Sequence, residues 1–160
     1  MTRKATKRKH YPLINCLQMA IEGACITDKA RLDKLRMREL GAIESFSKGQ
    51  ATPNDWRELA DMHNVAKTLV GMHIGGEEAK LACELADQAL QDAHASQATR
   101  GKLGMTGPQI QALRDLFGWH DAQRTAIHRG KYEQAIEHTV NVIRSRRHDV
   151  VQMQDRGLQL

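Results

Sequence analysis

Cysteine and aromatic residues are scarce in this 160-residue chain, which has three Cys, two Trp, two Tyr and two Phe. Three cysteines at irregular spacing do not make a disulfide framework, and without Cys-x-x-Cys spacing a structural zinc site has no support. The chain also lacks any run of about 18 apolar residues, which excludes a membrane-spanning helix. No signal peptide is visible at the start of the sequence. We therefore expect a cytoplasmic protein with no membrane partner.

Recognisable catalytic and metal-binding motifs are absent as well. The eight histidines include no His-Glu-x-x-His zinc motif and no Glu-x-x-His pair of the kind found in di-iron bundles. The glycine-rich stretches 71–76 and 101–107 lack the Lys-Ser/Thr ending of a phosphate-binding loop. We expect no catalytic residue, no metal and no cofactor, and we expect buried cysteines to act as small apolar side chains.

The composition predicts an all-α fold. The strong helix formers Ala, Leu, Met, Gln, Glu, Lys and Arg make up more than half of the chain, whereas the β-branched residues of sheets are few. Each of the three prolines, Pro12, Pro53 and Pro108, precedes an apolar stretch of helical period, where proline suits the first turn. A chain of this length is expected to form one domain.

Apolar periodicity and capping signals divide the chain into five or six helices packed as a bundle. Residues 1–12 are predicted to be a flexible basic arm, 13–145 the helical bundle and 146–160 a polar basic tail. Thr52 and Thr106 begin capping-box patterns, and Gly130 is predicted to break or kink the chain after the fifth helix. The expected helices cover 13–23, 28–48, 53–70, 77–98, 107–128 and 131–144.

Charge is unevenly distributed along the chain. Residues 1–12 carry five Lys/Arg and no acid, residues 13–98 carry nine cations and thirteen acids, and residues 99–160 carry ten cations and six acids. Clustered cations favour contact with phosphates, because neutralising a phosphate releases counterions. The candidate residues for binding nucleic acid or another anionic partner are Arg3, Lys4, Lys7, Arg8, Lys9, Arg144, Arg146 and Arg147. A solubilising tail explains the arm equally well.

A second group of polar residues lies on the fifth predicted helix. His120, Arg124 and His128 follow at intervals of four, next to Trp119, and this spacing places the three on one helical face. Such a patch could bind an anion, a nucleic-acid backbone or a carboxylate. An ordinary row of surface and boundary side chains has the same pattern.

Four segments of the chain resemble small uncharacterised helical proteins found in bacterial prophages and other mobile elements. These segments are KRKHYPLIN (7–15), LDKLRMRELGAIESF (32–46), GMTGPQIQALRDLF (104–117) and YEQAIEHTVNVIRS (132–145). The resemblance implies a role in regulating replication or transcription, or in binding and disabling a host protein. It therefore favours binding over catalysis and supplies no site residues.

Three functions remain open from the sequence. The first is a non-enzymatic, regulatory or accessory protein of a mobile element, which contacts nucleic acid through its basic arm with little base specificity. The second is a protein–protein effector that inhibits or adapts a host factor, an acidic host protein among the partners, with Trp56 or Trp119 as an anchor. The third is an enzyme that uses His120, His128 and a nearby acid. Alanine-rich stripes on the helices also predict a homodimer.

Overall fold

The computed structural model describes residues 29–146 and residue 153, and within this part of the chain it is all-α with no strand. This confirms the predicted fold class. The helix predicted at 13–23 lies outside the described residues, as do Cys16 and Cys25. The five described helices are α2 (Lys29–Ser47), α3 (Pro53–Gly71), α4 (Gly76–Arg100), α5 (Gly107–Ala126) and α6 (Arg129–Ser145).

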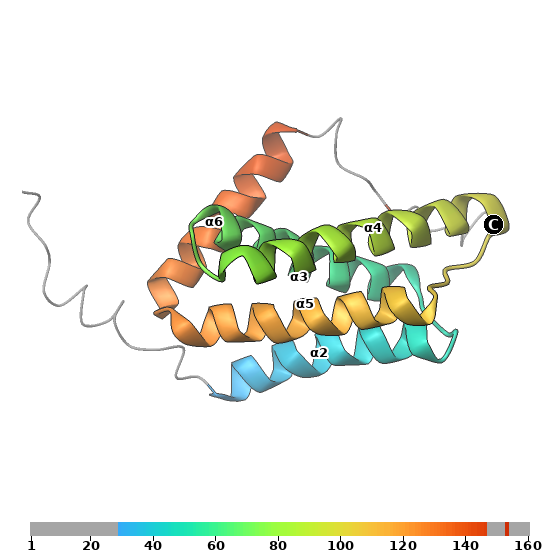
Figure 1. Ribbon diagram of the computed structural model, residues 1–160, viewed down its shortest axis with the longest axis horizontal. Helices are drawn as coiled ribbons and strands as arrows, with labels where there is room; N and C mark the ends of the chain where they lie inside the picture. Colours follow the sequence, from blue (N-terminus) through green and yellow to red (C-terminus); the bar gives the residue numbers. More distant parts are fainter. Residues whose placement is uncertain (1–28, 147–152, 154–160) are drawn as a thin grey trace, which may run out of the picture.

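Helices α2 to α5 pack together as a bundle, and α6 lies across it. Helix α2 packs against α3, α3 against α4 and α4 against α5. The bundle is closed by packing of α2 against α5. Figure 1 shows these helices extended along the long axis, whereas α6 is inclined to them and leaves the body of the bundle. Its main packing partner is α3. Because α6 crosses α3, it creates a hollow on each side of the crossing.

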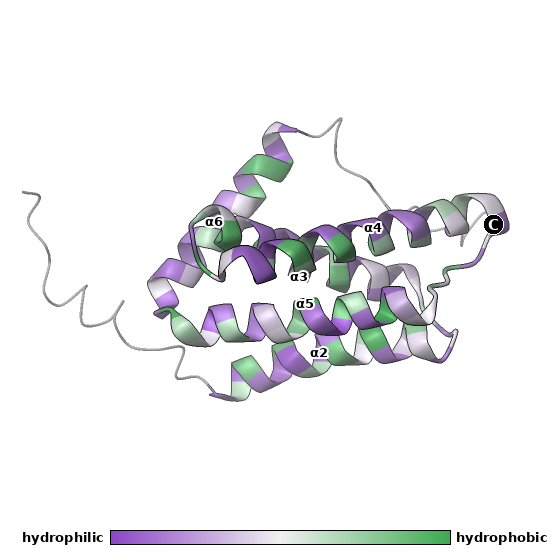
Figure 2. Ribbon diagram, in the orientation of Figure 1, coloured by the Kyte–Doolittle hydropathy of each residue, from purple (hydrophilic) through white to green (hydrophobic). Residues whose placement is uncertain are grey.

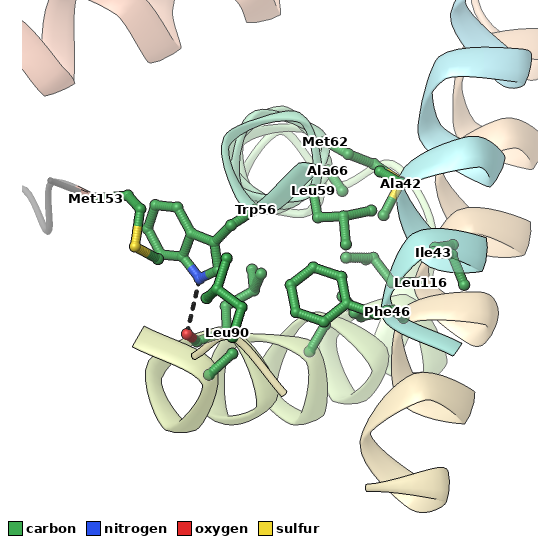
Figure 3. Packing of buried hydrophobic residues seen from close by; sticks show 14 of the residues in the cluster. Ala42, Ile43, Phe46, Trp56, Leu59, Met62, Ala66, Leu90, Leu116 and Met153 are labelled. Atoms are coloured by element: carbon green, nitrogen blue, oxygen red, sulfur yellow. Dashed lines mark hydrogen bonds between the residues drawn. The ribbon is translucent and has the colours of Figure 1, made fainter. Parts of the chain in front are cut away.

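The core lies where α2, α3, α4 and α5 meet. Figure 3 shows Met62 of α3 next to Ala42 of α2, and Leu59 of α3 directed towards Leu116 of α5 and Phe46 of α2. Trp56 lies at one end of this cluster, where its indole N–H donates to the Leu90 carbonyl at 2.9 Å. In Figure 2 hydrophobic and hydrophilic residues alternate along each helix, as expected for helices that each bury one face.

The predicted capping boxes form at the start of α3 and α5. The Thr52 hydroxyl accepts from the Asp55 backbone N–H at 3.3 Å, and the Asp55 carboxylate accepts from the Thr52 backbone N–H at 2.7 Å. At α5 the Gln109 side chain accepts from the Thr106 backbone N–H at 2.8 Å. These bonds satisfy donors that the first turn of a helix leaves without partners.

Two details of the sequence prediction are wrong. The chain does not break at Gly130, because α5 ends at Ala126 and the His128 side chain caps α6 two residues earlier by accepting from the Lys131 backbone N–H at 3.2 Å. Helical spacing with Ala82, Ala86, Ala89 and Ala93 predicts Leu85 on the apolar face of the fourth helix, but Leu85 is 53% exposed. The buried face of α4 consists mainly of alanines, with Cys83 and Leu90.

Candidate functional site

A network of buried charges ties α5 to α2. Arg124 is 0% exposed, and its guanidinium donates two hydrogen bonds to the Glu39 carboxylate at 3.0 and 2.7 Å. Its Nε donates to Asp121 at 3.0 Å, and Asp121 also accepts two bonds from Arg36 at 2.8 Å. The two carboxylates therefore neutralise a guanidinium that has no contact with water.

Burial and ion pairing shift the pKa values of Glu39 and Arg124 in opposite directions. Burial raises the pKa of Glu39, and the hydrogen bonds from Arg124 oppose that rise. Burial lowers the pKa of Arg124, but Glu39 and Asp121 outweigh it, so the pKa lies above its ordinary value. Arg124 is consequently a permanent internal cation with its donors occupied, and it is not available to an external anion.

His120 belongs to the same interior. It is 1% exposed, with its Nδ1 3.4 Å from the Gln123 side-chain oxygen and its Nε2 3.3 Å from the Tyr132 hydroxyl. Burial, followed by the nearby charge of Arg124, lowers the pKa of His120 to about 4. At neutral pH this imidazole carries no charge, so it joins α5 to α6 through neutral hydrogen bonds.

The four residues of the predicted polar patch therefore do not form one surface. His120 and Arg124 are buried, while Trp119 is 37% exposed. His128 is exposed at the start of α6, where it serves as a helix cap. Because His120 and His128 have different neighbours and different exposure, the structure does not bring them together as an acid–base pair.

The predicted anion-binding residues fall into two groups. Arg144 and Arg146 are exposed at the C-terminal end of α6. The remaining predicted cations lie outside the described residues; they are Arg3, Lys4, Lys7, Arg8, Lys9 and Arg147. Of the two tryptophans, Trp56 is a core residue, so only Trp119 has an exposed ring surface.

A cleft of about 700 Å³ lies between α3 and α6. Lys67 of α3 and Arg146 of α6 both line it, together with His138. Neither cation forms an ion pair within residues 29–146, and the cleft lining contains no carboxylate. The polar groups Asn64 and Thr68 complete its α3 wall. We call this hollow the α3–α6 cleft.

A smaller hollow of about 330 Å³ continues the α3–α6 cleft towards α4 and shares Asn64, Lys67 and Arg146 with it. Its lining includes His63, which is 5% exposed and whose Nε2 has no hydrogen-bond partner among the described residues. Burial lowers the pKa of His63, with Asp87 opposing and Lys67 adding to the effect. A buried imidazole nitrogen without a partner is uncommon, and it leaves one polar position for a bound group or water.

The other side of α6 has the opposite character. The cleft of about 300 Å³ there is lined by three carboxylates, those of Glu39, Glu58 and Asp61, and by the cation Arg38. The crossing of α6 over α3 thus separates an acid-rich hollow from one with unpaired cations. Of these two hollows beside α6, the α3–α6 cleft is the one that suits an anionic group.

Sequence reasoning did not select Lys67 or His63. Lys67 follows His63 by one helical turn on α3, so the two share a face, but whether Lys67 and Arg146 line one cleft depends on how α6 crosses α3.

The buried cysteine of the described chain, Cys83, is not available as a reactive thiol. Burial raises the pKa of the Cys83 thiol to about 11, which keeps it protonated, in agreement with its predicted role as a small apolar side chain.

Neither a metal site nor a membrane-spanning helix is present within the described residues. In residues 29–146 and at 153, no group of three or more His, Cys, Asp or Glu side chains is arranged to hold a metal ion. None of the described helices has the length and apolar character needed to cross a membrane. No protein-family profile matches the chain, and no curated protein or solved structure is significantly similar to it.

Proposed function

We propose that this protein is a non-enzymatic binding protein for nucleic acid, which holds the phosphate backbone in the α3–α6 cleft and with its basic N-terminal residues. The observation that carries the proposal is that Lys67 and Arg146 both line a cleft in which residues 29–146 contribute no carboxylate. Some other exposed cations of residues 29–146 have a carboxylate partner on the surface, such as Lys48 with Glu44 and Lys80 with Glu77. Because Lys67 and Arg146 have no ion-pair partner within residues 29–146, they are suited to neutralise an external anion.

Phosphate is the favoured ligand because of how these cations are presented. Lys67 of α3 and Arg146, the C-cap of α6, line one concave surface together with the side-chain amide of Asn64. Side chains of these types are the usual partners of phosphate oxygens, which position a protein on nucleic acid without reading its sequence. The five cations of residues 1–12 would extend the contact along the backbone.

The experiment is fluorescence anisotropy of a labelled DNA duplex and a labelled single strand over a series of salt concentrations. For the parent chain we expect the logarithm of the binding constant to fall linearly with the logarithm of the salt concentration. In the variant Lys67→Gln/Arg146→Gln the salt slope should fall by about 2, because each phosphate contact contributes about one unit.

The matched control is Lys48→Gln/Lys80→Gln, which removes the same charge from exposed sites outside the cleft. It should leave the salt slope close to that of the parent. Absence of binding by the parent chain at low salt would contradict the proposal. Equal losses in the cleft variant and the control would also contradict it, since they would mean that only net charge matters.

A further inference from the structure

Three large apolar side chains lie together on the outer face of α4 and α5. Leu81 is 56% exposed, Leu85 53% and Trp119 37%. They line a groove of about 610 Å³, and its remaining wall is made of small residues that allow another surface to approach closely. The small residues are Ala82, Ala112, Gly118 and Ala122. A cluster of exposed leucine and tryptophan side chains is typical of an interaction surface.

The register of α4 and α5 fixes where charges lie along this groove. The two helices are antiparallel: Gln109 donates to Asp92 at 2.8 Å near one end, and a Cβ at Gly75 would lie 3.0 Å from Gln123 Nε2 near the other. Glu78 therefore lines the groove near its Gly75 end. Arg114 lines it about two helical turns away, beside Leu85.

These two charges have no ion-pair partner within residues 29–146. The third charged residue of the rim, Asp115, already accepts a hydrogen bond from Gln111 at 2.8 Å. The groove thus has an unpaired anion towards one end, an unpaired cation towards the other and an apolar centre. Such a surface is complementary to itself when it is turned by a half rotation.

We propose that the α4–α5 groove is the interface of a homodimer, in which a second copy of this chain packs antiparallel about a two-fold axis through the centre of the groove. The rotation places Glu78 against Arg114 of the partner subunit, and the reverse pair forms by symmetry. Leu81, Leu85 and Trp119 of both copies are buried between the two pairs. A second copy is favoured over an unrelated partner because one rotation satisfies both unpaired charges and the apolar centre.

The first experiment is sedimentation velocity of the full chain from micromolar to millimolar concentration. We expect a species of twice the 18.0 kDa chain mass that dissociates on dilution. Leu81→Asp should abolish it, because Leu81 lies opposite Trp119 between the two charges and the substitution places a carboxylate at the apolar centre. A chain that remains at 18.0 kDa over the whole range would overturn the proposal and leave the groove to a different protein.

The charge pairs are tested by reversal and exchange. Glu78→Arg and Arg114→Glu should each raise the dimer dissociation constant at least tenfold, since each places like charges together twice. The double variant Glu78→Arg/Arg114→Glu should regain most of the parent affinity. Glu137→Arg, at an exposed position on α6, is the control and should have no effect. A dimer that survives Leu81→Asp, or a double variant no better than the single ones, would show that another surface is used.

Discussion

The residue with the most demanding environment is Arg124. Its guanidinium is removed from water and depends on Glu39 and Asp121 for compensation. It also lies 5.8 Å from the centre of the Phe117 ring, on the same helix. Breaking such a pair is costly because the remaining charge keeps its desolvation penalty and loses its counterion.

Replacing Arg124 by Met should therefore reduce the free energy of unfolding by about 3 to 5 kcal/mol. The double variant Glu39→Leu/Arg124→Met should recover much of this loss, since no buried charge remains on either side chain. Urea unfolding followed by circular dichroism measures both effects. Lys80→Met, which removes only an exposed pair with Glu77, should change stability by less than about 1 kcal/mol. A comparable loss in this control would contradict the account.

His120 predicts a dependence of stability on pH. Its pKa is about 4 in the folded protein against an ordinary value of 6.5, so the unfolded chain takes up the proton first as pH falls. The contribution of His120 to stability is fully present above about pH 6.5 and is lost as pH falls towards 4. The loss of unfolding free energy reaches about 2 kcal/mol by pH 5.

Urea unfolding of the parent and of His120→Gln at pH 7.5 and pH 5 tests this expectation. The parent should lose more stability than the variant between the two pH values. His63, whose pKa is also lowered by burial, should leave a residual dependence in the variant. His73→Asn, at an exposed residue, should behave like the parent. An identical pH dependence in the parent and in His120→Gln would refute the role given to His120.

The environment of Arg124 and His120 was only partly foreseeable. Both continue the buried stripe of α5 that contains Leu113 and Leu116, so helical period alone could have assigned them to the interior. Their polar character instead favoured a surface patch. The partner Glu39 is 85 residues away in the sequence, and no spacing rule within one helix can identify it.

Helices and their starts were more predictable than the loops between them. Capping signals at Thr52 and Thr106 act within a few residues, so the sequence alone identifies them. The α5–α6 break was misplaced because His128, which is not among the commonest capping residues, caps the start of α6 before Gly130. The crossing of α6 over α3, which builds the candidate site, depends on packing between distant segments and was not predicted.

The turn between α3 and α4 gives a prediction for these elements. Gly75 has a φ of 115°, and an added Cβ would lie 2.7 Å from the Ala79 Cβ and 3.0 Å from Gln123 Nε2. The Gln123 side chain also donates to the Ile74 carbonyl at 2.7 Å. Since a larger residue would strain the backbone and displace this link to α5, Gly75→Ala should destabilise the protein.

The matched comparison is Gly49→Ala, where φ is 68° and the space around the added Cβ is open. Backbone strain alone should cost about 1 kcal/mol there, and Gly75→Ala should cost clearly more. Thermal unfolding of the two variants and the parent measures the difference. Equal melting temperatures for the two variants would mean that the contacts around Gly75 do not restrain the turn.

At the scale of the whole molecule, the crossing of α6 over α3 brings cations from distant parts of the sequence into the α3–α6 cleft. The sequence foresaw Arg144 and Arg146 as anion-binding candidates from their clustering, and the structure leaves both exposed at the end of α6. It did not foresee that Arg146 would share a carboxylate-free cleft with Lys67. That arrangement arises only when α6 lies across α3, so no linear pattern of charges could have predicted it.

The central claim, that the α3–α6 cleft holds phosphates of a nucleic acid, is tested most directly by NMR. Backbone amide shifts of the isotopically labelled full chain are followed while a short DNA duplex is added. Among the described residues, we expect the largest shifts at Asn64, Lys67, Thr68 and residues 142–146. The same shifts should be smaller in the variant Lys67→Gln/Arg146→Gln. Shifts that avoid these residues and fall instead along the α4–α5 groove, or no shifts at all at low salt, would contradict it.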